Sequence, residues 1–353
     1  MDSALTVNDG IPQPPIINPN AGKLLKKRPA RQLTTGDYLK GIKAGHIPTL
    51  AQAITLTEST LVEDRKKARE LITACHPLSG NSIRIGITGV PGVGKSTFIE
   101  AFGKYIIRLG HRLAVLAIDP SSERSKGSIL GDKTRMESLA NNENAFIRPS
   151  PSGGSLGGVA RKTREAVILC EAAGFDVIFI ETVGVGQSEI AVHSMTDFFL
   201  LLMLSGAGDG LQGIKRGIME MSDLLVINKA DGSNIEKATK ARILYQSALH
   251  LFPPSPSGWT PAALTASAIE ETGLEEILDA IFRYMDLTKS NGYFFRKRKE
   301  QAVYWMKESI DESLLSRFYN NPNVTEALTI IEKQVAAGET DPFEAAGRIL
   351  NII

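Results

Sequence analysis

The sequence predicts an α/β fold in which a mostly parallel sheet is flanked by helices, and two observations support this. Helical stretches separate a series of short, mainly apolar runs, which indicates strands buried on both faces. Each run ends in a polar or glycine-rich turn, and ligands bind at the carboxyl ends of such strands. The runs are Ile83–Thr88, Leu113–Ile118, Val177–Ile180, Phe198–Leu204 and Leu224–Ile227.

Helical extensions are expected on both sides of this sheet region, which we place at residues 81–290. Residues 1–35 contain five prolines and a basic run and are predicted to be a disordered tail. Residues 36–80 are predicted to be helical. Residues 291–353 are also predicted to be helical, and these helices either cover the domain or meet another subunit. The predicted apolar faces are Leu61, Ala68, Leu71 and Ile72; Val303, Met306, Ile310, Leu314 and Phe318; and Val324, Leu328, Ile331 and Val335.

The composition excludes several classes of protein. Forty basic residues balance 39 acidic ones in the 353-residue chain, so bulk charge indicates neither a nucleic-acid nor a membrane partner. The longest apolar run, Phe198–Leu204, is too short to cross a bilayer. Cys75 and Cys170 have no metal-clip spacing, and no secretory segment precedes them. We therefore expect a cytoplasmic protein in a reducing compartment.

A phosphate-binding loop is predicted directly after the first apolar run. Residues 89–96, GVPGVGKS, match the pattern G-x-x-x-x-G-K-[ST], and a helical stretch follows. Glycines let backbone N–H groups converge on phosphates, and the helix N-terminus adds positive potential. Lys95 is expected to reach the β- and γ-phosphates, and the Ser96 hydroxyl to bind Mg²⁺. The competing interpretation is a glycine turn with a surface lysine.

A guanine-reading loop is predicted after the last apolar run, where Asn228-Lys-Ala-Asp231 has the form N-K-x-D. The Asp231 carboxylate can accept both N1–H and N2–H of guanine, whereas adenine lacks this pair of donors. Thr265-Ala-Ser-Ala268 suits a loop that closes over the base. The alternative is that Asn228 and Asp231 only cap the next helix. Together with the phosphate loop, the pattern predicts a GTP-hydrolysing protein.

A carboxylate and a glycine follow the third apolar run in the Walker-B arrangement, at Glu181-Thr-Val-Gly184. The acid is expected to hold Mg²⁺, and the Gly184 amide to sense the γ-phosphate. Val185, rather than glutamine, follows the glycine, so Gln187 is the remaining candidate to orient water.

Two further polar segments are candidates for the site. Asp119 ends the second apolar run and either caps a helix or belongs to the site. The loop at residues 127–135 contains Asp132 between glycines and basic residues and could order around nucleotide and metal. The glycine-rich residues 206–217 contain Lys215 and form either a mobile loop near the ligand or a long connector.

These motifs, in this order, resemble the MeaB/ArgK family, which includes the methylmalonic aciduria type A protein. The segments that carry the resemblance are GVPGVGKST, AIDPSS, GSILGDKTRM, ETVGVGQSE, LQGIKRGIME and VINKAD, within residues 40–350. The resemblance implies a SIMIBI-class P-loop GTPase and a homodimer formed partly through the C-terminal helices. It also implies a chaperone for methylmalonyl-CoA mutase or a related B12-dependent acyl-CoA mutase, which gates adenosylcobalamin loading and protects the enzyme.

Position by position, the resemblance implies the site residues. The residues implied to bind the phosphates or sense the γ-phosphate are Gly89, Val90, Pro91, Gly92, Val93, Gly94, Lys95, Ser96, Thr97 and Gly184. Guanine binding falls to Asn228, Lys229, Asp231, Ser267, Ala268 and Ile269. Mg²⁺ and the switch region fall to Ser96, Asp119, Asp132 and Glu181. The catalytic set is Lys95, Asp132, Glu181 and Lys215, and Lys215 is expected to link partner binding to hydrolysis.

Two other functions remain as hypotheses. A nickel metallochaperone of the same class would need a His- or Cys-rich metal site, and the five histidines and two cysteines are scattered. A transport-system protein kinase would need a kinase catalytic loop, which the sequence lacks. From the phosphate and guanine motifs, GTP and GDP are the expected substrate and product, with Mg²⁺ as the cofactor.

Overall fold

The computed structural model describes residues 33–118, 136–149, 156–182, 188–206 and 216–352. Within these ranges the chain forms a seven-stranded sheet in the order β3-β2-β4-β1-β5-β6-β7, with every neighbouring pair parallel. The strands are β1 (Ile83–Gly89), β2 (Leu113–Ile118), β3 (Ala145–Arg148), β4 (Val177–Thr182), β5 (Phe198–Leu204), β6 (Leu224–Asn228) and β7 (Ala262–Thr265). The α/β prediction is confirmed.

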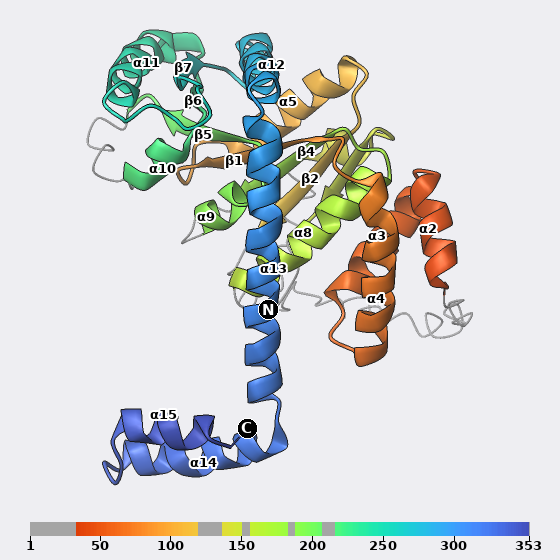
Figure 1. The fold of residues 1–353 in the computed structure, drawn as a ribbon. Coiled ribbons are helices and arrows are strands. Elements are labelled where there is room, and N and C mark those ends of the chain that lie inside the picture. The colour runs from red at the N-terminus through yellow and green to blue at the C-terminus, as the bar shows by residue number, and fades with distance from the viewer. Residues whose placement is uncertain (1–32, 119–135, 150–155, 183–187, 207–215, 353) are drawn as a thin grey trace, which may run out of the picture.

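Helices cover both faces of the sheet and extend beyond it (Figure 1). Before the sheet come α2 (Thr35–Lys43), α3 (Ile47–Glu58), α4 (Val62–Cys75) and the 3₁₀ turn η1 (His76–Leu78). Between strands lie α5 (Lys95–Arg108), α7 (Glu137–Ala140), α8 (Leu156–Ala172), α9 (Ser188–His193), α10 (Arg216–Met221), η3 (Gly232–Asn234) and α11 (Ile235–Leu249). After the sheet come α12 (Leu274–Ser290), α13 (Tyr293–Tyr319), α14 (Pro322–Ala336) and α15 (Pro342–Leu350). None of these helices is both long and apolar enough to span a membrane.

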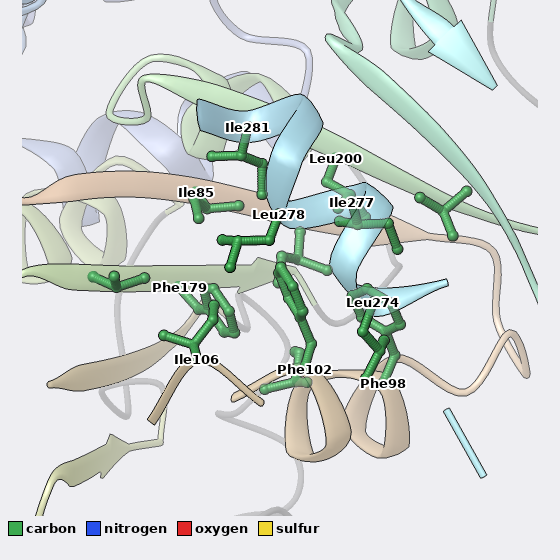
Figure 2. Packing of buried hydrophobic residues seen from close by; sticks show 14 of the residues in the cluster. Ile85, Phe98, Phe102, Ile106, Phe179, Leu200, Leu274, Ile277, Leu278 and Ile281 are labelled. Atoms are coloured by element: carbon green, nitrogen blue, oxygen red, sulfur yellow. The ribbon is translucent and has the colours of Figure 1, made fainter. Parts of the chain in front are cut away.

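The strands are mainly apolar because successive side chains enter different cores. In β2, Leu113 and Val115 pack with α5 and α12, whereas Ala114 and Leu116 pack with α3, α4 and α8. Figure 2 shows the first core, in which Phe102 of α5 lies with α12 residues beside the sheet. The rings of Phe102 and Phe179 stack at 5.6 Å. The second core contains both cysteines as free thiols.

One expected position needs correction, two strands were not predicted, and one of two alternatives for α13 is excluded. The edge strands β3 and β7 were not predicted, because each has four residues and neither is a long apolar run. Leu61, expected on the apolar face of α4, precedes that helix and is exposed. Val303 and its neighbours on α13 are also exposed, so they do not cover the sheet domain.

Buried ion pairs fix α13 to the amino ends of β1 and β5. The Arg298 guanidinium donates to both carboxylate oxygens of Asp197, at 2.8 and 2.7 Å, and to the carbonyl oxygen of Ser82. Asp197 also accepts from the Arg84 backbone N–H, and the Arg84 side chain forms a bidentate pair with Glu171. Burial alone would raise the pKa of Asp197, but the hydrogen bonds and charge of Arg298 hold it below its usual value.

Arg298→Met should destabilise the protein by about 3–5 kcal/mol, because it leaves the Asp197 carboxylate buried without its cation. The folded-state pKa of Asp197 is depressed, so its stabilisation is present above about pH 4 and is lost as the pH falls. The difference between wild type and variant should therefore shrink below about pH 4. Urea unfolding at several pH values measures this. Arg296→Met is the control, since Arg296 is exposed, and a change of under about 0.5 kcal/mol is expected.

Candidate functional site

The predicted phosphate loop lies between β1 and α5, at the centre of the sheet. β1 ends at Gly89, and α5 begins at Lys95 after a turn in which Gly92 and Gly94 have φ of 77° and 87°. Such positive φ values favour glycine. No side chain caps the N-terminus of α5, so its first backbone N–H groups face the loop. This geometry suits an anion at the helix N-terminus.

Gly89 is required by the close approach of β5. A Cβ atom at this position would lie 2.6 Å from the carbonyl oxygen of Leu202, a backbone atom that cannot rotate away. The φ of Gly89 is not positive, so the requirement is the close contact rather than backbone strain. The loop therefore leaves β1 directly beside the end of β5.

Lys95 is held over the same loop. Its Nζ donates to the carbonyl oxygen of Gly89 at 3.0 Å, and its side chain is half-buried. Burial lowers the pKa of Lys95, whereas the charges of Glu181 and Glu189 raise it. The ammonium group thus lies within the field of two carboxylates, at the start of the phosphate loop.

The predicted base-reading loop is bonded directly to the phosphate loop. The Asn228 side-chain amide donates to the carbonyl oxygen of Val93 at 2.8 Å. The Lys229 Nζ donates to the carbonyl oxygen of Gly92 at 3.0 Å. Asn228 is buried, and Lys229 has a φ of 60°, which is uncommon for a residue with a side chain. The end of β6 therefore holds the glycine turn that follows β1.

Asp231 is oriented by the loop after β7. Its carboxylate oxygen Oδ2 accepts a hydrogen bond of 2.6 Å from the Ser267 hydroxyl, and Ser267 is buried. The backbone N–H of Ala230 donates to the carbonyl oxygen of Ala266, which joins the two loops again. Ala268 is nearly buried, whereas the Ile269 side chain is 78% exposed. The six predicted guanine-binding positions are thus brought together.

Glu181 lies inside β4 rather than after it. The strand continues to Thr182 because Glu181 still pairs with Ile87 of β1 and Ala117 of β2. Glu181 is buried, and the hydroxyls of Thr88 and Thr182 are 2.8 Å apart beside it in the sheet. The carboxylate is therefore fixed on the strand next to the phosphate loop.

Glu189, in the first turn of α9, was not singled out from the sequence. It is buried, and its negative charge acts on Lys95 together with that of Glu181. Its position in the segment that follows Glu181 could have indicated a place in the site. However, acidic residues are common at helix starts because they interact favourably with the helix dipole, so the position alone does not predict a functional role.

Five candidate site residues lie outside the described ranges: Asp119, Asp132, Gly184, Gln187 and Lys215. The nickel hypothesis can be examined only for the remaining chain. There, no group of three or more His, Cys, Asp or Glu side chains is placed to hold a metal ion.

Comparison with known proteins identifies the family. The family model described as methylmalonyl Co-A mutase-associated GTPase MeaB matches residues 50–323. The chain belongs to the MeaB family of GTPases.

Relatives of the same family agree over most of the chain. A putative GTPase of Caulobacter vibrioides is 52% identical over 307 residues, 87% of this chain and 94% of that protein. The mitochondrial methylmalonic aciduria type A homolog of Mus musculus is 45% identical over 320 residues, 88% of this chain and 77% of that protein. A crystal structure described as LAO/AO transport system kinase is 37% identical with a TM-score of 0.70, covering 90% and 97% of the two chains. This MeaB-family protein is therefore a P-loop GTPase that hydrolyses GTP.

Gly89→Ala should destabilise this MeaB-family protein by about 1–3 kcal/mol, because the added Cβ would overlap the Leu202 carbonyl oxygen. Thermal unfolding of the full chain measures the effect. Gly347→Ala is the matched control, since a Cβ there meets nothing within 4 Å on helix α15. It should stabilise the protein by about 0.5–1 kcal/mol. Equal unfolding temperatures for the two variants would contradict the assignment of Gly89 to a close contact.

Proposed function

We propose that this MeaB-family GTPase is a chaperone of a B12-dependent acyl-CoA mutase such as methylmalonyl-CoA mutase, gating adenosylcobalamin loading and protecting the loaded enzyme. The observation that carries the proposal is the family match over residues 50–323, because the family is described by its association with this mutase. The name of the mouse relative, which refers to methylmalonic aciduria, supports the same pathway. A cytoplasmic location stays a prediction.

In this proposal, different loops at the carboxyl end of the sheet recognise the phosphates and the base of GTP. The backbone of residues 89–97 binds the phosphates, with Lys95 reaching the β- and γ-phosphates. Asp231 reads guanine, with Ser267 orienting its carboxylate and residues 267–269 lying against the base. Asn228 and Lys229 hold the phosphate loop in place, which their bonds to Val93 and Gly92 support.

Mg²⁺ is the cofactor that this site implies. The Ser96 hydroxyl in the first turn of α5 and the buried Glu181 carboxylate are oxygen donors of the kind Mg²⁺ prefers, so the described residues fit the ion. Asp119 and Asp132 complete the proposed set. When bound, the ion would neutralise charge on the phosphates.

Slow basal hydrolysis is expected, because Val185 occupies the position of the water-orienting glutamine in Ras-like GTPases. We propose that Lys215, on its glycine-rich loop, brings a positive charge to the transition state when the mutase binds. A partner that favours the closed position of this loop would raise the rate by population shift.

The C-terminal helices are proposed as a dimerisation extension, residues 291–353. On α13 the contacts with the sheet domain fall on one face: Gln301 and Trp305 donate to carbonyls of Thr196 and Ser194, and Glu308 pairs with Arg164. The opposite face presents an apolar stripe spaced by three or four residues, and each member is about half exposed: Val303, Met306, Ile310 and Leu314. Helix α13 runs away from the sheet toward α14 and α15 (Figure 1). An exposed stripe of this length favours a second copy of the chain as its partner.

Asp231→Asn should lose GTP affinity and gain affinity for xanthosine triphosphate, because the amide can no longer accept both guanine donors. Rejection of a base that leaves buried polar groups unpaired reaches about 10⁴-fold in sites of this kind. Calorimetry with both nucleotides measures the change. Glu236→Gln, on the exposed start of α11, is the control and should leave both affinities unchanged. Unaltered GTP affinity in Asp231→Asn would remove Asp231 from the base site.

Lys215→Ala should keep GTP binding and slow basal hydrolysis little, yet lose most of the stimulation by methylmalonyl-CoA mutase. Charges brought to GTPase transition states raise rates by about 10³–10⁵-fold in arginine-finger systems, which sets the upper bound for the loss. Single-turnover GTP hydrolysis with and without the mutase gives the comparison. A fully stimulated variant would assign the charge to the partner, whereas a wild-type protein that the mutase neither binds nor stimulates would contradict the proposed function itself.

A further inference from the structure

A cavity of about 350 Å³ lies away from both predicted nucleotide loops. It is bounded by the connection from α3 to α4, by α4, by the first turns of α8 and by α13, and none of its lining residues belongs to the predicted nucleotide site. Its volume is within the range of small-molecule sites in proteins. Five cations line it, and we call it the cationic cavity: Arg65, Arg69, Arg161, Lys162 and Arg317.

Within the described residues, four of these five cations form no ion pair, although the charges of Arg69 and Lys162 also act on Glu165. Two carboxylates also line the cavity, Glu165 and Glu312, and within the described ranges both pair with Arg161, at 3.6 and 3.5 Å. The other four cations have no carboxylate within 4.0 Å and no side-chain hydrogen bond in the part of the chain that the structure describes. Five converging cations and two carboxylates leave an excess of positive potential in one concave surface.

Arg161 is held in the wall of the cavity by its two carboxylate neighbours. Its Nε atom is buried and has no hydrogen-bond acceptor among the described residues. Buried N–H groups of guanidinium are nearly always paired, and the neighbouring carboxylate of Glu165 is beyond hydrogen-bond distance from this atom. The Nε atom has almost no accessible surface, so a ligand in the cavity would contact the rest of the Arg161 guanidinium, whose side chain is 30% exposed.

The lining also restricts the kind of ligand. Apart from Ala68 and Gly158, the wall consists of charged side chains and hydroxyl groups such as those of Thr60 and Ser313. It offers no aromatic or large aliphatic surface for a nucleobase or an acyl chain. Guanidinium groups bind phosphate oxygens through paired hydrogen bonds, so compact phosphate groups fit this wall better than a single carboxylate.

We propose that the cationic cavity binds a small molecule carrying two or more phosphate groups. Its walls include α4, which precedes the sheet in the sequence, and α13, which follows the sheet. A bound polyanion would bridge the cations of α4 and α8 to Arg317 of α13, so it would stabilise the position of α13 on the sheet domain. The apolar stripe of α13 faces away from Glu312, so this site and the proposed dimer contact do not compete.

The test is isothermal titration calorimetry of the full chain with fructose 1,6-bisphosphate as the probe. Saturating GDP and Mg²⁺ are present throughout, so the phosphate loop is occupied. One site per chain is expected, and Arg69→Gln/Lys162→Gln should weaken binding by about 10-fold or more, because charge-assisted contacts are lost. Lys66→Gln/Lys67→Gln removes the same charge from α4 outside the cavity and should bind like wild type.

Thermal unfolding of both variants verifies that they are folded before titration. Absence of binding to the wild type under these conditions would overturn the proposal, as would equal affinity in wild type and Arg69→Gln/Lys162→Gln. A hexaglutamate peptide is titrated in parallel. If the peptide binds more tightly than the bisphosphate with the same dependence on Arg69 and Lys162, the cavity is a contact for an acidic protein segment, and the small-molecule assignment is wrong.

Discussion

The bonds from Asn228 and Lys229 to the phosphate loop are the interactions on which the site depends. The loop has three glycines, two of them at positive φ, so its own backbone does little to hold one conformation. The carbonyl oxygens of Val93 and Gly92 accept hydrogen bonds from the end of β6. The base-reading loop is in turn bonded to the loop after β7 through Ala230 and Ala266. In the proposed nucleotide site, recognition of the base and of the phosphates therefore rests on one connected structure.

This connection requires a sheet whose strands end at the same edge. Gly89 is in register with Leu202 of β5, and Asn228 is in register with Leu204 of the same strand, so β5 sets the spacing between the two loops. Burial of both faces keeps that register, because a slip would move apolar side chains out of their cores. At the opposite edge, the ion pair of Asp197 and Arg298 joins the amino end of β5 to α13.

The central strands could be predicted because burial on both faces leaves an uninterrupted apolar run, as in Phe198–Leu204. The edge strands β3 and β7 could not, since an edge position needs less burial and four residues carry little pattern. The ends of strands were also underestimated. Glu181 and Asn228 are polar, yet both continue their strands, because the ladder of hydrogen bonds extends to the ligand-binding edge.

Some residues of the proposed site could also be predicted from the sequence, and others could not. Lys95 and Asp231 follow from motifs in which one residue performs one chemical task. Three other features depend on distances between strands. They are the hydrogen bond from Asn228 to Val93, the hydrogen bond from Ser267 to Asp231, and the charge of Glu189 near Lys95. Contacts between residues more than 30 positions apart leave no local pattern in a single sequence.

The central claim is that the base-reading loop supports the phosphate loop, and pyrophosphate affinity tests it most directly because this ligand has no base. Asn228→Ala should weaken pyrophosphate binding by about 2- to 12-fold, the effect of losing one hydrogen bond, and should weaken GDP binding at least as much. Asp231→Asn should leave pyrophosphate binding unchanged. Calorimetry of the two variants with both ligands provides the comparison. Unchanged pyrophosphate affinity in a folded Asn228→Ala variant would contradict the account.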